Sequence, residues 1–417
     1  MTEQEEMLCI RETIDTAVKD GCDKFVIVPY GRFGAMAKDI LNNEYKIDES
    51  FIVDNFKYDN KTIFKLDDLP LDKSLSYCFI IVSKDYIGME FRTKIEDKYG
   101  DNSKIYKVEY LSDEQKEICN SSDKLKLDFF CCGFGKCGTT SLDNALKSNP
   151  NIFLPEMKET MFLSRMNKVG VRLLKKCFKE SETAGKVVGE IYPHAAVYPE
   201  RAYRYYGADT KIIFMVRNLY SAISSMFMWD VQLFGNKKNM HIFEENDGHV
   251  DATMFKHWLE EGSNRNLKVY NYNSIIREWI YYFGRDNVKI VLSEDLFANT
   301  KEVMDDVQRF IGLEESKIVD ISEFPHSNSN GRVSKDLHSS MVYSKIVDAM
   351  NLAIYNFPET FNDFTKIRNE VWEEISVPFD RKSLLTEENK KIIWDYYEAE
   401  IHGLEELLDR SLEGIWY

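Results

Sequence analysis

The sequence has no long apolar run, no leader-like N-terminus and no excess of basic residues. Its apolar stretches all fall short of the roughly 20 residues that cross a bilayer, and the opening MTEQEEMLCIRETIDTAVKD carries acids where a signal peptide needs basic and then apolar residues. The sequence therefore predicts a chain with neither a membrane span nor an export signal.

Cysteine is present but not in a pattern that binds metal or forms a disulfide framework. The last of the eight cysteines is Cys177, and none stands in a CxxC or Cys/His arrangement with zinc spacing. Extracellular disulfide scaffolds rarely have this distribution. We therefore expect no metal site, reduced thiols and a cytoplasmic location.

The charge balance is acidic, with 54 Lys and Arg against 70 Asp and Glu and a formal net charge of −16. Proteins that bind nucleic acid gain affinity mainly from Lys and Arg that neutralise phosphates, so we expect no nucleic-acid partner. Net charge does not exclude a local basic pocket for one small anion. It does disfavour a strongly polyanionic partner.

Length and pattern indicate two domains, because 417 residues exceed one typical core. Short apolar runs at 25–28, 51–53, 77–82 and 105–108 alternate with helical patterns, which is typical of a parallel α/β layer. The polar stretch 111–126 is predicted to be a linker. We expect a Rossmann-like domain over 1–122 and a larger domain over 123–417.

The first domain contains a turn that imitates a dinucleotide-binding fingerprint. Residues 29–34 follow a predicted strand and open a helix, and Asp54 ends a strand 20 residues after Gly34. Pro29 replaces the first glycine of the fingerprint, and Arg32 would crowd or recruit a phosphate. The unit resembles domains appended to bacterial sugar-modifying enzymes. Nucleotide binding and a role as scaffold or homo-oligomerisation module both remain open.

The second domain opens with a strand over 127–132, a glycine-rich turn and a helix that ends before Pro150. Small residues let backbone N–H groups close around a phosphate, and a helix N-terminus adds partial positive charge. An ATP-binding P-loop places its lysine directly after the last glycine, whereas Lys136 precedes Gly138. This order favours a group transfer that needs no metal over the reaction of a kinase or other nucleotide hydrolase. An absolute requirement for Mg²⁺ would favour the kinase or hydrolase instead.

The run GFGKCGTTSL resembles the 5′-phosphosulfate-binding loop of sulfotransferases that use 3′-phosphoadenosine 5′-phosphosulfate (PAPS). The resemblance implies a P-loop-like sulfotransferase domain with a central parallel sheet. It also implies that Lys136 contacts the 5′-phosphate and the bridging oxygen of the leaving group, with 3′,5′-ADP as the product. Residues 138–141 would wrap the 5′-phosphate.

Downstream segments resemble the family's 3′-phosphate site. Arg217 ends an apolar strand and Ser225 follows eight residues later, with Leu219 where proline is usual. The family's late Gly-Arg loop matches Gly331-Arg332 at the end of the polar turn 326–332. The donor site implied by these matches consists of Gly135, Lys136, Cys137, Gly138, Thr139, Thr140, Ser141, Arg217, Ser225 and Arg332.

The general base has two candidates. Residues 155–163 resemble the Lys-Glu-x-x-Phe-Phe segment of glycan sulfotransferases, which implies that Glu159 is the base and that Lys158 supports the sulfonate or the acceptor. His194 competes, because cytosolic small-molecule sulfotransferases use a histidine after an intermediate strand. Ile191 stands where glycan enzymes often have a lysine. The catalytic candidates are therefore Glu159, Lys136 and His194.

The acceptor is expected to be a hydroxyl compound, and a carbohydrate is favoured. A small alcohol, or a non-catalytic protein that binds 3′,5′-ADP or PAPS, is the alternative. Aromatic and histidine side chains after the 3′-phosphate segment are candidates to stack on sugars or simply to pack. They are Trp229, Phe234, His241, Phe243, His249, His257 and Trp258.

Overall fold

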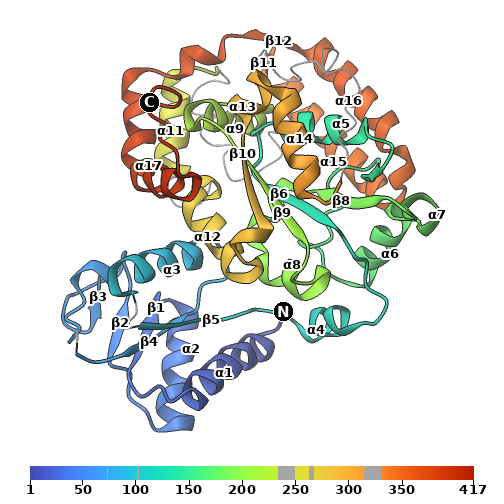
Figure 1. Cartoon of the computed structure of the whole chain (residues 1–417). Helices are drawn as coiled ribbons and strands as arrows, with labels where there is room; N and C mark the ends of the chain where they lie inside the picture. The colour runs from blue at the N-terminus through green and yellow to red at the C-terminus, as the bar shows by residue number, and fades with distance from the viewer. Residues whose placement is uncertain (73, 101–102, 233–248, 263–266, 314–330) are drawn as a thin grey trace. The chain divides into compact units, whose positions relative to one another are not determined.

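The structure is a computed structural model that describes residues 1–72, 74–100, 103–232, 249–262, 267–313 and 331–417 (Figure 1). The chain divides into two compact units. The first consists of Met1–Asp123 together with Ser274–Tyr282, and the second of Lys124–Asn273 and Phe283–Tyr417. The first unit thus includes a short piece of chain that comes far later in the sequence.

The first unit is a parallel sheet covered by helices. Its strands are β1 (Phe25–Val28), β2 (Phe51–Val53), β3 (Ile63–Phe64), β4 (Tyr77–Ile81) and β5 (Ser103–Lys107), in the spatial order β3-β2-β1-β4-β5. Its helices are α1 (Glu3–Lys19), α2 (Arg32–Ile40), α3 (Tyr86–Tyr99), α4 (Asp113–Asn120) and the central part of α12 (Tyr272–Phe283). Strands buried on both faces are continuous apolar runs, which is why the sequence reveals them. The predicted Rossmann-like α/β pattern is confirmed.

The predicted linker over 111–126 is wrong in its middle, where α4 forms. Ser112 caps this helix: its hydroxyl accepts from the Gln115 N–H at 3.3 Å, and the Gln115 side chain accepts from the Ser112 N–H at 3.0 Å. Ile118 and Cys119 are buried. A capping box followed by two apolar positions is enough to form a short helix within a polar stretch.

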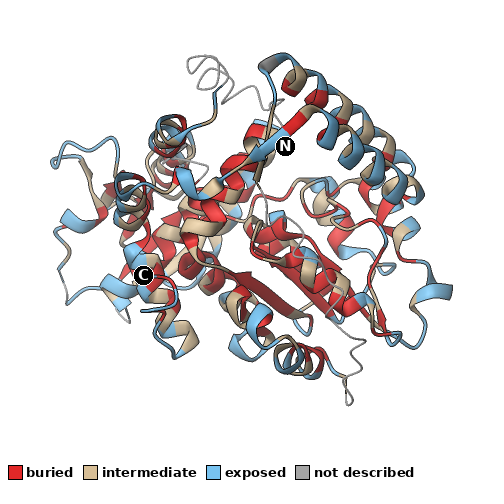
Figure 2. Cartoon of the chain, turned by 90° about the horizontal axis from the view of Figure 1, so that it is seen from above, coloured by how far each residue is buried: buried red, intermediate tan, exposed pale blue. Residues whose placement is uncertain are grey.

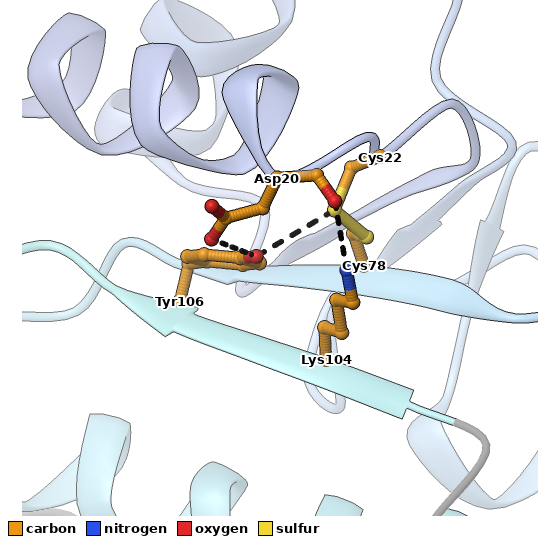
Figure 3. Close-up of a disulfide and its surroundings, with 5 residues drawn as sticks. All are labelled: Asp20, Cys22, Cys78, Lys104 and Tyr106. Atoms are coloured by element: carbon orange, nitrogen blue, oxygen red, sulfur yellow. Dashed lines mark hydrogen bonds between the residues drawn. A yellow bond between two sulfur atoms is a disulfide. The ribbon is translucent and has the colours of Figure 1, made fainter.

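The expectation of reduced thiols is wrong for one pair, because Cys22 and Cys78 form a disulfide (Figure 3). Cys22 lies just before β1, and Phe25 of β1 pairs in register with Cys78 of β4. Parallel pairing therefore brings the two Cα atoms within 6.1 Å across 56 residues of sequence. Close by, the Tyr106 hydroxyl donates to Asp20 at 2.8 Å. The free cysteines among the described residues are Cys9, Cys119, Cys131, Cys132, Cys137 and Cys177.

In the turn after β1, the residues that resemble a dinucleotide-binding fingerprint contact other residues of the first unit. Gly34 allows the helix to approach the strand end, since a Cβ there would lie 2.7 Å from the Pro29 carbonyl oxygen. Arg32 pairs with the buried Glu6 at 2.9 Å. Asp54 accepts from the backbone N–H groups two and three residues further on, at 2.9 and 3.0 Å. Both charged side chains of the fingerprint are thus engaged locally.

A buried ion cluster joins the late segment to the rest of the first unit. Glu278 of α12 is fully buried and meets Arg92 at 2.8 Å and Lys107 at 2.9 Å. Burial by itself raises the pKa of a carboxyl group, but Lys107 and Arg92 outweigh this and lower the pKa of Glu278. The carboxylate is therefore charged and compensated inside the unit.

The second unit is built on another parallel sheet. Its strands are β6 (Phe129–Gly133), β7 (Ile152–Phe153), β8 (Val187–Ile191), β9 (Lys211–Val216) and β10 (Val288–Leu292), in the order β10-β9-β6-β8-β7. Figure 2 shows central strands in red, which marks them as buried. β6 lies between β8 and β9, so the direction of winding reverses there. In open parallel sheets ligands bind at such a reversal, beyond the carboxyl ends of the strands.

Helices and one small antiparallel pair complete the second unit. The pair is β11 (Gly331–Ser334) with β12 (Ser376–Phe379). The helices are α5 (Thr139–Lys147), α6 (Lys168–Cys177), α7 (Glu180–Thr183), α8 (Pro199–Tyr206), α9 (Leu219–Gln232), α11 (Ala252–Gly262), α13 (Ser293–Ala298), α14 (Thr300–Phe310), α15 (Leu337–Asn356), α16 (Phe361–Ile375) and α17 (Glu387–Leu408). Across the described parts of the chain, no helix combines the length and apolar character needed to cross a membrane.

Candidate active site

The loop between β6 and α5 lies at the reversal of the second sheet. The predicted strand, glycine-rich turn and helix are confirmed, and Gly138 is the N-cap of α5 with φ of 87°. Only glycine adopts this backbone readily, and a Cβ there would also lie 3.1 Å from the Ser293 hydroxyl. Lys136 has φ of 63°, which is strained for a residue with a side chain. The turn therefore brings the start of α5 and Lys136 to one place.

Lys136 is a desolvated cation. Its Nζ lies 5.2 Å from the centre of the Trp229 ring. Burial lowers the pKa of Lys136 to about 8, although the negative charge of Glu159 opposes the shift. Arg217 donates to the Lys136 carbonyl oxygen at 3.2 Å. The strand-end arginine and the loop lysine, predicted separately, are thus neighbours.

Lys158 is bound to the same loop. Its Nζ donates to the hydroxyls of Thr139 at 3.2 Å and Thr140 at 3.1 Å. It also lies 3.5 Å from Glu159 Oε1. A second lysine therefore reaches the hydroxyl groups at the start of α5, and the candidate base Glu159 lies next to this lysine.

The backbone beside Glu159 is held by Glu190. Glu159 has a left-handed φ of 68°. The next residue, Thr160, donates its N–H to Glu190 at 3.1 Å and its hydroxyl to the same oxygen, while Tyr206 donates to the other oxygen at 3.1 Å. Burial raises the pKa of Glu190. Sequence reasoning missed this role, although an acid inside the apolar strand β8 was a signal for it.

His194 lies on the turn after β8 and faces the same charges. Its ring is stacked on Trp229 with centroids 6.0 Å apart and is exposed to solvent. Surrounding protein desolvates the imidazole enough to lower the pKa of His194, against the opposing charge of Glu159, while Lys136 adds to the lowering. The structure therefore brings together all three predicted catalytic side chains.

Asp230 is a site residue that sequence reasoning missed. Its Oδ2 accepts from the indole N–H of the buried Trp258 at 3.1 Å, and its charge acts on Lys136. Burial raises the pKa of Asp230 to about 6. Of the aromatic candidates, His257 is paired with Glu261 at 3.2 Å. Phe234, His241 and Phe243 lie outside the described residues, as do residues 326–330 of the polar turn.

The predicted second anion segment is the end of β9 followed by α9. Ser225 lies in α9 and is half-buried, about two turns after Arg217. Asn218 caps α9, since its Oδ1 accepts from the Ser221 N–H at 3.2 Å. This cap starts the helix without the proline that Leu219 replaces.

Arg332 is placed differently from Arg217. Its Nε donates to the Ser376 hydroxyl at 2.8 Å, and its Nη2 donates to the carbonyl oxygens of Ser376 at 2.9 Å and Glu373 at 3.1 Å. The guanidinium therefore closes the end of α16. Among the residues that the structure describes, no hydrogen bond joins the Arg332 guanidinium to the loop between β6 and α5.

Two buried tyrosines tie the pieces of the site together. Tyr270 donates to the Gly135 carbonyl oxygen at 3.1 Å. Tyr272 donates to the Arg217 carbonyl oxygen at 3.1 Å and lies 3.2 Å from the Cys137 sulfur. The two tyrosines donate to backbone carbonyl oxygens, one in the loop after β6 and one just after β9, and so hold both segments with uncharged groups.

Comparison with known proteins gives the family. The sulfotransferase domain family matches residues 126–346, more than half of the chain, and the chain belongs to that family. No curated protein matches the chain significantly.

Several solved structures resemble the chain. A sulfotransferase from Alicyclobacillus acidocaldarius is 19% identical, with 70% of this chain and 98% of that one covered and a TM-score of 0.44. Mouse sulfotransferase SULT7A1, solved as a complex with PAP, is 17% identical, with 49% and 64% covered and a TM-score of 0.32. Sulfotransferase STF9 from Mycobacterium avium is 11% identical, with 52% and 67% covered and a TM-score of 0.29.

Proposed function

We propose that the chain transfers a sulfuryl group from PAPS to a hydroxyl group of a carbohydrate. The observation that carries the proposal is the meeting of Lys136, Lys158 and Glu159 at the start of α5. Two cations and a helix N-terminus suit a phosphosulfate, and a carboxylate beside them suits an alcohol that must lose its proton.

The residues present fit the donor. Gly138 adds no side chain at the start of α5, while Thr139 and Thr140 offer hydroxyls that Lys158 already bonds. PAPS supplies the sulfuryl group and a phosphate leaving group. In our proposal Lys136 neutralises the charge that develops on the bridging oxygen, because a desolvated cation acts strongly on charge that appears beside it.

Glu159 is our candidate for the general base. Its position is set by strained backbone and by the Thr160–Glu190 bonds, which suits a group that must meet one proton in one direction. His194 is the second candidate, because the charges of Glu159, Lys136 and Lys158 all act on its ring. The lowered pKa of His194 keeps its ring neutral, as a base must be.

The acceptor side supports a sugar. Trp229 is partly exposed, and its ring centre lies 5.2 Å from Lys136 Nζ and 6.0 Å from the His194 ring centre, so an aromatic side chain borders the catalytic groups. Aromatic faces of this kind bind apolar sugar faces, while polar tips bind hydroxyls.

For the rest of the chain, we propose a domain boundary near residue 122. We also propose a scaffold or homo-oligomerisation role for the first unit, because the charged fingerprint residues Arg32 and Asp54 are bonded within that unit.

The test is a transfer assay with radiolabelled PAPS and a panel of glycans and small alcohols. Glu159→Gln is expected to lower kcat by about 10²–10⁴-fold while the Kd for 3′,5′-ADP stays unchanged. Glu156→Gln is the matched control, since Glu156 is an exposed acid of the same segment. Normal turnover in Glu159→Gln, with loss in His194→Gln, would transfer the base role to His194. No turnover by the unaltered chain on any acceptor would overturn the proposal.

A further inference from the structure

The segment 160–164, which follows the candidate base, packs against the stretch 190–206 that runs from the end of β8 through α8. The ring of the fully buried Phe162 lies with its centroid 4.5 Å from that of Tyr205 and 6.5 Å from that of Tyr206. Aromatic pairs at such distances add to the stabilisation that burial gives. The middle of the segment is therefore anchored by apolar contact, in addition to the hydrogen bonds at its start.

Two further hydrogen bonds hold the far end of the same segment. Arg201 of α8 donates from Nη1 to the Leu163 carbonyl oxygen at 2.9 Å. Its guanidinium also lies over the Tyr198 ring, 4.5 Å from the ring centre. The buried Tyr192, which directly follows β8, donates to the Ser164 hydroxyl at 3.0 Å. The segment is thus tied at its start, middle and end to one continuous stretch of chain.

The same stretch carries the second candidate base. His194 lies in the short turn Pro193–Val197 between β8 and α8. The stretch therefore presents His194 itself and holds Glu159 through the segment that follows it. A general base must meet its proton in one direction, and a misplacement of about 1 Å is enough to slow a reaction strongly. The bonds from this stretch can therefore affect turnover without a contact to either substrate.

We propose that Arg201 is a positioning residue of the transfer reaction, which acts through Glu159 by holding the Leu163 carbonyl. Tyr192 supports the same segment one residue further on. The inference rests on the proposed function, because it assumes that Glu159 is the base. A guanidinium suits this task, since it stays charged and its planar donors are fixed in direction. The bond lies outside the loop between β6 and α5, so we expect donor binding to be independent of it.

The first test separates kcat in the transfer assay from donor affinity. We expect Arg201→Met to lower kcat about 10- to 100-fold with Kd for 3′,5′-ADP unchanged. Arg201→Lys should recover part of the loss, because its ammonium can still donate to a carbonyl, and Tyr192→Phe should give a smaller fall of the same kind. Arg204→Met is the matched control, since Arg204 is an exposed arginine of the same helix, and it should change neither value.

A double-mutant cycle identifies the group through which Arg201 acts. In a Glu159→Gln background, Arg201→Met should cause little further loss of kcat, because the group that it positions is already gone. In a His194→Gln background the full loss should remain. Additive losses with Glu159→Gln, or coupling to His194→Gln instead, would overturn the proposal.

Hydrogen exchange gives a measurement that needs no turnover. The N–H groups of Thr160 and Arg165 are hydrogen-bonded, so peptides over 159–165 report how firmly the segment is held. We expect faster exchange there in Arg201→Met than in Arg204→Met, with β6 unchanged. Unchanged exchange at 159–165, or an equal rise in β6, would contradict the positioning role.

The outcomes separate this inference from the proposed function. If the unaltered chain transfers no sulfuryl group to any acceptor, the proposed function fails and the role of Arg201 in it fails too. If the unaltered chain turns over and Arg201→Met keeps the same kcat, the function stands and only the assignment of Arg201 is overturned. A parallel loss of kcat and of affinity for 3′,5′-ADP also overturns it, since that result indicates a role in folding.

Discussion

Lys136 and Glu159, the two residues to which we assign the chemistry, both have left-handed backbone. Such a conformation costs about 1–3 kcal/mol in a residue with a side chain, and it persists only where surrounding bonds impose it. Arg217 holds the carbonyl of Lys136, and the Thr160–Glu190 bonds hold the backbone after Glu159. Strain at both positions is consistent with side chains held in place before the ligand arrives.

Substitutions of Thr160 test whether the Thr160–Glu190 bonds hold Glu159 in position. Thr160→Val keeps the shape but removes the hydroxyl bond to Glu190, and leaves a buried oxygen with one donor fewer. We expect kcat to fall about tenfold or more with Kd for 3′,5′-ADP unchanged, and Thr160→Ser to behave like the unaltered chain. A parallel fall in affinity and kcat would show that the bond serves folding rather than positioning.

The pKa of Lys136 predicts how donor affinity depends on pH. Because burial lowers this pKa to about 8, the ammonium is mostly charged at pH 7 and mostly neutral at pH 9. Affinity for 3′,5′-ADP is therefore expected to fall above pH 8 by up to about tenfold per pH unit. Calorimetry from pH 7 to 9.5 measures this, and a flat profile would contradict it. Lys136→Arg stays charged and should remove the dependence.

At the scale of elements, local patterns predicted what local physics determines. Buried strands are visible as apolar runs, and the turn at Lys136 is visible because one short segment contains glycine, lysine and hydroxyls. Glu190 and Asp230 were missed because their contacts join strands and helices far apart in sequence. The Cys22–Cys78 bond was missed for the same reason, since only the β1–β4 pairing creates it.

The ion cluster on α12 predicts an element-scale effect on stability. Glu278→Gln removes the buried carboxylate that Arg92 meets at 2.8 Å and Lys107 meets at 2.9 Å, and is expected to cost about 3–5 kcal/mol. Asp97→Asn breaks a more exposed pair with Arg277 and should cost less than about 1 kcal/mol. Hydrogen exchange of β4 and α12 measures both, and equal effects would contradict the assignment.

The same cluster has a pH dependence with a definite sign. The pKa of Glu278 is lowered in the folded state, so its contribution is present above the unfolded value of about 4.3 and is lost as pH falls through the folded value. The difference in stability between the unaltered chain and Glu278→Gln should therefore shrink on acidification. A difference that grows at low pH would reverse the sign.

At the scale of the whole molecule, the net charge of −16 and a site rich in Lys and Arg describe different things. The total charge influences solubility and disfavours polyanionic partners, whereas anion binding at the site depends on a few desolvated cations. The sequence could therefore disfavour a nucleic-acid partner and still predict a local anion site. It could not show that the first unit draws Ser274–Tyr282 from the later chain.

That late segment predicts how fragments behave. Residues 1–123 alone lack Glu278, the buried carboxylate that meets Arg92 and Lys107, whose side chains are 4% and 6% exposed. We expect this fragment to melt at lower temperature than the same fragment with residues 272–283 joined by a flexible linker. The linked fragment with Glu278→Gln is the control. Equal melting temperatures measured by circular dichroism would contradict the prediction.

The position of Ser274–Tyr282 also sets an order of events during synthesis. The first unit emerges from the ribosome with its sheet complete but one helix missing, and 150 residues, 124–273, are translated before that helix appears. At 5–20 residues per second this delay is on the order of ten seconds. During that time Arg92 and Lys107 have been synthesised but Glu278 has not. The nascent chain is therefore most exposed to chaperones and proteases while its second half is still being translated.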